Sequence, residues 1–134
     1  IHNSARSQMA EAYLKKFGGD QYHVESAGLE AGNLNPFAVK AMQEDGIDIS
    51  NNKTKDVFEF FKEGRLYNYV VTVCDEASAA RCPIFPGVHK KINWSFEDPS
   101  SFAGDDAERL NKTIIVRDTI KNAVMEFIKQ TGTN

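Results

Sequence analysis

Residues 1–14 have the sequence IHNSARSQMAEAYL, and this stretch decides the fold. Asn3 and Ser4 have short polar side chains that hold a tight loop by bonding to its own backbone. Met9, Tyr13 and other apolar residues then recur at helical spacing, and two glycines at 18–19 supply a stop. The stretch therefore predicts a polar loop that leads directly into a helix over residues 7–17.

A loop of this kind suits an anion. Unpaired N–H groups at a helix start point outward and carry about half a positive charge, which binds phosphate-like groups. Arg6 adds a planar guanidinium that matches two oxygens of a tetrahedral oxyanion, and Ser7 can cap the helix or donate to the anion. A cysteine at the base of such a loop would have its pKa lowered from about 8.5 to about 3.5–7.5. An anion site alone predicts a binding module, whereas that nucleophile would make an enzyme.

Helices and strands alternate along the rest of the chain. We expect strands over 22–28, 66–74 and 90–96, of which 66–74 (LYNYVVTVC) is the most apolar run and is typical of a buried strand. We expect helices at about 36–45, with Asn35 as the N-cap and Gly46 at the end, and at 56–62 and 106–130. The inward stripe of the last helix is Leu110, Ile114, Ile120, Val124 and Ile128. This alternation predicts an α/β fold with parallel βαβ units and helices on both faces of the sheet.

The chain begins with a helix, whereas a fold of this type places a strand before its first helix, with the ligand at that strand's carboxyl end. We therefore expect a short apolar strand, central in the sheet, in the residues before Ile1. No repeat, linker or low-complexity tract divides the sequence, so residues 1–134 form one domain that lacks its first strand.

Composition excludes several classes of protein. The net charge of -3 and the pI near 5.6 argue against a nucleic-acid partner. No apolar stretch approaches 18 residues and no signal peptide is visible, so we expect no membrane partner and a cytoplasmic location. Two cysteines in such a compartment are reduced at rest. The chain, at 134 residues, is long enough for a core without a disulfide scaffold, and we expect a monomer.

The motifs resemble those of a known family. Preceded by a cysteine, IHNSARSQMAE would have the Cys-x5-Arg-Ser pattern of the phosphate-binding loop of low-molecular-weight protein tyrosine phosphatases, and NSARSQMAE resembles the thioredoxin-coupled arsenate reductases of that fold. ESAG, NPFAVKAM, GIDIS, VVTVCDEA, CPIFPG and the DPS stretch extend the resemblance along nearly the whole chain. His2 departs from the glycine common in the phosphatases. The resemblance implies a three-layer sandwich with a four-stranded parallel sheet, and an oxyanion held by residues Ile1, His2, Asn3, Ser4, Ala5 and Arg6.

Cys74 and Cys82 invite several interpretations. Four interpretations are open: two buried apolar thiols, a structural disulfide, a pair of metal ligands, or a redox relay. The spacing of the two cysteines is not a zinc-binding pattern, which argues against the metal ligands. The resemblance favours the relay. An expected cysteine before Ile1 attacks arsenate, Cys74 attacks that arsenylated sulfur, and Cys82 attacks the resulting disulfide, which thioredoxin or a similar thiol reductant then reduces. A helical segment would separate the two Cα atoms by about 12 Å, whereas a disulfide needs roughly 4.4–6.8 Å. We therefore expect the segment to be partly helical when reduced and looped when oxidised.

Asp98 precedes a proline after the third predicted strand, and the resemblance gives it the role of general acid. Phosphatases of this fold typically have tyrosines after Asp-Pro, whereas Ser100, Ser101 and Phe102 stand here, which favours a small inorganic oxyanion over phosphotyrosine. A phosphatase and a non-catalytic oxyanion-binding module are the alternatives, and residual phosphatase activity fits the loop. No organic cofactor is implied.

Several other residues lie outside this mechanism. As in some relatives, an oxygen-rich site for a monovalent cation beneath the loop would be formed by Asn3, Glu11, Ser26 and Asp56. We expect Trp94 and the phenylalanines of 58–61 to pack in the core and the groove, and Lys90 and Lys91 to lie on a solvated edge.

Overall fold

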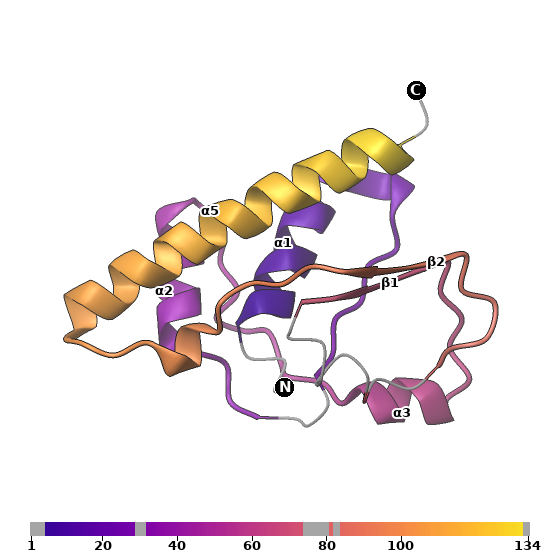
Figure 1. Ribbon diagram of the computed structural model, residues 1–134, viewed down its shortest axis with the longest axis horizontal. Helices are drawn as coiled ribbons and strands as arrows, with labels where there is room; N and C mark the ends of the chain where they lie inside the picture. Colours follow the sequence, from indigo (N-terminus) through magenta and orange to yellow (C-terminus); the bar gives the residue numbers. More distant parts are fainter. Residues whose placement is uncertain (1–4, 29–31, 74–80, 82–83, 133–134) are drawn as a thin grey trace.

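The computed structural model describes residues 5–28, 32–73, 81 and 84–132 (Figure 1). Its elements, in chain order, are α1 (Arg6–Gly18), the 3-10 turn η1 (Gly19–Gln21), α2 (Pro36–Glu44), α3 (Val57–Lys62), β1 (Tyr69–Thr72), β2 (Lys90–Asn93), the 3-10 turn η2 (Pro99–Ser101) and α5 (Asp106–Thr131).

Local signals predicted the helices closely. α1 begins at Arg6, one residue earlier than expected, and ends at Gly18, after which Gly19 takes a φ of 59° that favours glycine. In α2 the Asn35 side chain accepts hydrogen bonds from the N–H groups of Phe37 and Ala38 at 2.8 and 3.3 Å, and Gly46 has a φ of 79° just beyond the end. The predictions for α3 and α5 are confirmed to within a residue or two at each end.

The core lies between α1, α2 and α5, where α5 runs across the other two helices (Figure 1). Met9 and Tyr13 of α1 are fully buried and pack in one cluster with Met42 and the buried face of α5. The predicted stripe of α5 is confirmed at Ile120 and Val124. Val116 and Phe127 are also buried, as are the polar Thr113 and Arg117, whereas Leu110, Ile114 and Ile128 are half-buried.

Within the described residues the sheet has two strands. β1 and β2 pair in parallel, with Tyr69 opposite Lys90 and Thr72 opposite Asn93. The described residues form no strand over 22–28; there the segment makes one bridge, from Gly28 to Asp56. An α/β fold with a parallel pair of strands is therefore present, and the described part of the chain forms two of the four predicted strands.

The expectation that 66–74 is a buried strand is wrong in one respect. Val70 and Val71 are only half-buried, and Leu66 is 71% exposed. The physical reason is that β1 pairs with β2 on one edge and borders a cavity of about 1210 Å³ elsewhere. Its other walls include residues 22–28, residues 32–36, the start of α1, part of α5 and Asp98.

The aromatic residues also differ in part from expectation. Trp94 packs against the core and lies 5.9 Å, centroid to centroid, from Phe127, as predicted. No residue of the short helix α3 is buried, and its Phe58 and Phe61 side chains are 38% and 44% exposed. Lys90 and Lys91 are exposed, as predicted.

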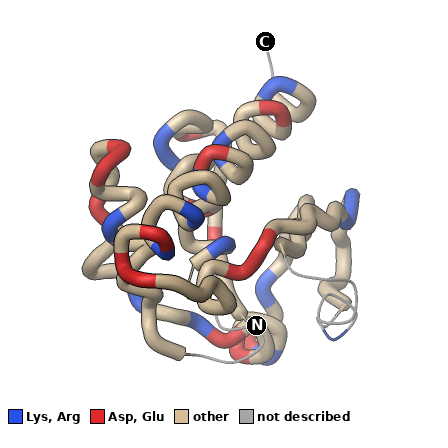
Figure 2. The backbone as a smooth tube through the Cα atoms, turned by 60° about the vertical axis from the view of Figure 1, so that its left-hand side comes forward, with Lys and Arg blue, Asp and Glu red and all other residues tan. Residues whose placement is uncertain are grey.

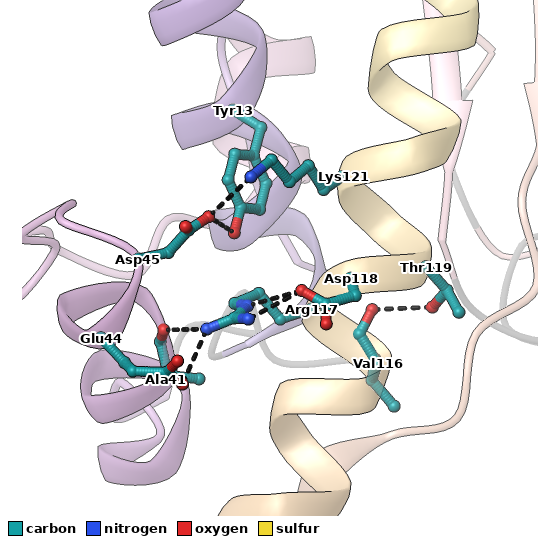
Figure 3. A network of polar contacts seen from close by, with 9 residues as sticks. All are labelled: Tyr13, Ala41, Glu44, Asp45, Val116, Arg117, Asp118, Thr119 and Lys121. Carbon is teal, nitrogen blue, oxygen red and sulfur yellow. Dashed lines mark hydrogen bonds and ion pairs between the residues drawn. The ribbon is translucent and has the colours of Figure 1, made fainter.

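A polar network fastens the three core helices together (Figure 3). The hydroxyl of the buried Tyr13 donates to Asp45 at 2.8 Å, and Lys121 reaches the same carboxylate at 3.1 Å. Burial and the Asp45 carboxylate raise the pKa of Tyr13 far above its usual range, so its hydroxyl stays a donor. On the next turn of α5, Arg117 donates to the backbone oxygen of Ala41 at 2.9 Å.

Charged residues of both signs occur along the described elements. Positions of Lys and Arg are interspersed with those of Asp and Glu along the backbone, and α5 carries both signs (Figure 2). Within the described ranges, no helix is long and apolar enough to cross a bilayer.

The Arg117 contacts make a prediction about stability. Its side chain is only 8% exposed, so Arg117→Met leaves the Ala41 oxygen without this partner and lowers the free energy of unfolding by about 2 kcal/mol. Lys121→Met, at a site 35% exposed, should cost less than about 1 kcal/mol. Urea unfolding of both variants measures the difference. Equal losses would show that the buried guanidinium contributes nothing specific.

Candidate functional site

The candidate site lies at the start of α1, beside the carboxyl ends of β1 and β2. Arg6 is the first residue of the helix, and its guanidinium donates to the backbone oxygen of Phe96 at 3.1 Å, shortly after β2 ends. Thr72 at the end of β1 accepts from the N–H of Trp94 at 2.7 Å, which keeps the two strand ends together. These contacts place Arg6, at the start of α1, beside the carboxyl ends of the two strands.

Arg6 and Asp98 meet at this place. Arg6 Nη2 lies 3.4 Å from Asp98 Oδ2, and the Arg6 side chain is 11% exposed. The other carboxylate oxygen of Asp98 accepts from the N–H of Ser100 at 3.0 Å and so caps η2. The two oxygens thus have separate tasks, because one fixes the turn and the other faces the guanidinium.

The environment keeps Asp98 ionised. Partial burial by itself raises the pKa of this carboxyl, but the Ser100 N–H and the charge of Arg6 outweigh burial, so the pKa lies below its ordinary value of 3.8. A general acid needs the opposite shift. In this arrangement Asp98 is therefore a counter-ion to Arg6, and its role as general acid stays a prediction.

The start of α1 is arranged for an external anion. Its N-cap residue, Ala5, makes no side-chain bond to the helix N–H groups, and the first turn contains no acidic residue. Ser7 lies in this turn and, with Arg6 and Asp98, lines the cavity described above. A tetrahedral oxyanion at the end of the helix would find a positive dipole and a guanidinium on the same side.

Four of the predicted loop residues and both cysteines are not among the described residues. Ile1, His2, Asn3 and Ser4, and likewise Cys74 and Cys82, are outside the described residues. Their predicted roles, and the predicted change of the segment between the cysteines, stay predictions.

Two residues of the predicted cation set, Glu11 and Asp56, have partners within the protein, and a third, Asn3, lies outside the described residues. Glu11 is 6% exposed, and its carboxylate is paired with Lys15 at 3.4 Å and with Lys55 at 3.5 Å. Asp56 instead caps α3 by accepting from the N–H of Phe58 at 2.8 Å. Among the described residues, no three His, Cys, Asp or Glu side chains are grouped closely enough to hold a metal ion. Two ammonium groups therefore already neutralise the Glu11 carboxylate, and the predicted cation site stays a prediction.

Two residues that support the site were missed from the sequence. The Gln8 side chain is fully buried, donates to the backbone oxygen of Lys53 at 3.0 Å and accepts from Asn52 at 3.2 Å. The second is Lys55, whose ammonium lies 3.5 Å from the Glu11 carboxylate. Gln8 and Lys55 both join α1 to a segment distant in the sequence, and a single sequence has no local signal for such pairs.

The fold and the site together define a class of α/β protein in which an arginine and a carboxylate meet at the start of a helix beside parallel strand ends. Residues 1–134 match the family model described as low molecular weight phosphotyrosine protein phosphatase. The chain belongs to this family.

Relatives within the family are more specific. An arsenate reductase of Bacillus subtilis (strain 168) is 46% identical over 127 residues, which cover 93% of this chain and 88% of that protein. A solved arsenate reductase in the phosphate binding state is 30% identical, with a TM-score of 0.77 over 96% of this chain and 92% of that one. The thioredoxin-dependent arsenate reductase of Corynebacterium glutamicum is 27% identical, with a TM-score of 0.72 over 97% of this chain and 57% of that one.

The Arg6–Asp98 pair makes a prediction about titration. Arg6→Met removes the positive charge, so the pKa of Asp98 should rise toward its ordinary value, and Arg6→Lys should raise it less. Because the native pKa is lowered, the pair stabilises the fold above about pH 4, and that stability is lost as the pH falls through the lowered pKa. Carboxyl ¹³C NMR titration measures the shift. An unchanged Asp98 titration in Arg6→Met would contradict the pairing.

Proposed function

We propose that this protein reduces arsenate to arsenite, using a cysteine directly before Ile1 as nucleophile and Cys74 and Cys82 as the relay. The observation that carries the proposal is the meeting of Arg6 and Asp98 at the start of α1. An oxyanion-binding arginine and a proton donor are the two groups that displacement at arsenic requires. The arsenate reductases at 40–46% identity support the choice of substrate.

Arsenate would be held by the backbone N–H groups of residues 1–6 and by the Arg6 guanidinium. Ser7, in the first turn, would stabilise the thiolate at the base of the loop. The thiolate attacks arsenic, an S–As bond forms, and the leaving oxygen departs as water after taking a proton from Asp98. No oxidation state changes in this step.

Reduction follows in the relay. The Cys74 thiolate attacks the sulfur of the S–As bond, a disulfide forms, and the bonding electron pair leaves with arsenic, which becomes arsenite. Cys82 then attacks Cys74 and releases the nucleophile. Thioredoxin or a similar thiol reductant reduces the Cys74–Cys82 disulfide, and the thioredoxin-dependent structural relative supports this choice. Because thiols supply both electrons, no organic cofactor is needed.

Arg6 connects substrate binding to the proton on Asp98. An arsenate dianion competes with the Asp98 carboxylate for the same guanidinium, since Arg6 Nη2 is 3.4 Å from Oδ2. Once the dianion is bound, its negative charge and the loss of the Arg6 pairing both raise the pKa of Asp98. The acid would therefore gain its proton as the substrate arrives.

The cavity beside β1 supports the proposed upstream strand. It is bordered by β1, by residues 22–28 and by the start of α1, where a preceding strand would end. A strand there would pair with β1 and bury Val70 and Val71, and with residues 22–28 would complete a four-stranded parallel sheet between two layers of helices. The carboxyl end of this upstream strand would place the nucleophile beside Arg6.

We also propose that the protein is a monomer and that it acts in the cytoplasm, where thiols are kept reduced.

A phosphatase is the second candidate, and the family description favours it. Phosphate and arsenate match in charge and shape, so the loop amides and Arg6 would hold either. The residues after Asp98 argue for the smaller substrate, because Ser100 and Ser101 are exposed and offer no aromatic surface for a phosphotyrosine ring.

Three cysteine variants separate these functions in the protein extended by its upstream residues. We expect arsenite formation with thioredoxin in the unaltered protein. We expect at least a hundredfold loss in Cys74→Ser and in Cys82→Ser, since each breaks the relay. Hydrolysis of an aryl phosphate should survive both changes and be lost only when the upstream cysteine is replaced.

Each alternative has its own outcome in this assay. Aryl phosphate turnover without arsenite formation would favour the phosphatase and contradict the proposal. Arsenate or phosphate binding without either activity would favour the binding module. An upstream residue other than cysteine would remove the mechanism.

The relay also predicts a structural change. Formation of the Cys74–Cys82 disulfide should lower the helical circular dichroism signal and increase protease cleavage between residues 74 and 82, because a helix holds the two Cα atoms too far apart. Cys82→Ser under the same oxidising conditions is the control. Equal spectra and equal cleavage in both redox forms would contradict the change.

A further inference from the structure

Glu11 is a buried carboxylate that needs a counter-charge. It lies in α1 shortly after Arg6, and its side chain is 6% exposed. A carboxylate withdrawn from water to this extent is strongly disfavoured unless it is paired. Lys55 Nζ lies 3.5 Å from one of its oxygens and Lys15 Nζ lies 3.4 Å from the other. Each oxygen therefore has an ammonium of its own.

The two lysines differ in position. Lys15 follows Glu11 by four residues on the same helix, and its side chain is 57% exposed. The Lys15–Glu11 pair therefore contributes little to the free energy of unfolding. Lys55 comes from a different segment and is 31% exposed. Its ammonium is the more enclosed of the two, and it ties α1 to another part of the chain.

The backbone around Lys55 is fixed on both sides. The Lys55 oxygen accepts from the N–H of Gly28 at 2.8 Å, and the N–H of Val57 donates to the Gly28 oxygen at 2.8 Å. Two residues before Lys55, the Lys53 oxygen accepts from the Gln8 side chain of α1. Lys55 therefore lies in a segment, residues 52–57, that hydrogen bonds already hold against α1. This reduces the conformational entropy lost when the Lys55 side chain is ordered.

We propose that the Lys55 ammonium is the built-in cation of this site, and that the protein does not use a free monovalent metal ion there. An ammonium carries the same unit charge as such an ion and already contacts the central carboxylate. A third cation would be repelled by two ammonium groups within about 4 Å of the same carboxylate. This inference goes beyond the proposed function and does not depend on it.

A built-in cation has a consequence for the site. An exchangeable ion would make the position of α1, and with it Arg6, depend on salt composition. The Lys55 ammonium is part of the chain, so its contact between α1 and residues 52–57 does not depend on which metal ion the salt supplies. Lys55 is thus a positioning residue that acts through Glu11, and it touches no reacting group.

The first test compares salts on the unaltered full-length protein. Melting temperatures are measured in potassium, sodium and tetramethylammonium chloride at equal ionic strength, because tetramethylammonium is too bulky to replace a bound metal ion. We expect equal melting temperatures within about 1 °C, well below the shift that tight binding of an ion produces. A rise of several degrees specific to potassium or sodium would overturn the proposal.

The second test removes the Lys55 ammonium by substitution. Lys55→Met should melt several degrees lower in tetramethylammonium chloride and recover part of that loss in potassium or sodium chloride, because Glu11 then lacks a counter-charge that a metal ion can supply. Lys15→Met is the matched control, and it should change little and show no preference among the salts. The double variant Glu11→Gln/Lys55→Met should also show none. A Lys55→Met protein without a salt preference, or a Lys15→Met protein with one, would overturn the proposal.

A conservative variant keeps the test decisive if Lys55→Met does not fold. Lys55→Arg retains the charge and should melt equally in the three salts, whereas a requirement for potassium or sodium would contradict the proposal. All of these measurements use the unreacted protein. Failure of arsenate reduction would therefore overturn the proposed function alone, and a salt preference would overturn this inference alone.

Discussion

The packing of α1 against α5 is the constraint on which the rest of the structure depends. Met9 and Tyr13 are fully buried and share one apolar cluster with Ile120 and Val124 of α5. Full burial of two large side chains contributes roughly 1.5–3 kcal/mol for each of them, far more than any ion pair on the surface. The same helix carries Arg6 on its first turn, so the energy that builds the core also positions the group that would bind the oxyanion.

Polar contacts then set the rotation and tilt of α1, which apolar packing leaves loosely defined. The Tyr13 hydroxyl on one side fastens it to Asp45 after α2, and Gln8 and Glu11 fasten it to residues 52–55. These contacts are directional, so they fix one orientation among those that the apolar surface tolerates. Arg6 reaches the Phe96 oxygen because that orientation is fixed.

Much of this could be predicted from local sequence, and the remainder depends on partners distant in the chain. Asn35 and Gly46 mark the limits of α2 through hydrogen bonds to near neighbours, and Pro36 does so through its fixed φ, so the prediction was close. The burial of β1 was overestimated because it depends on what lies beside the strand, which the composition of LYNYVVTVC does not contain. Lys55 was missed for the same reason, and the resemblance, not the spacing, indicated Asp98.

Arg6 has to satisfy two opposite requirements. Without an oxyanion, a guanidinium that is 11% exposed needs a negative partner, and Asp98 supplies it. With an oxyanion, the proposed reaction needs Asp98 neutral and protonated. A single charge exchange acts toward both requirements, because an anion that takes over Arg6 removes one of the interactions that lower the pKa of Asp98 and brings a negative charge that raises it. The second Asp98 oxygen continues to accept from the N–H of Ser100, so the carboxyl stays in place while its proton changes. The lowered pKa of Asp98 in this structure is therefore consistent with the role of an acid.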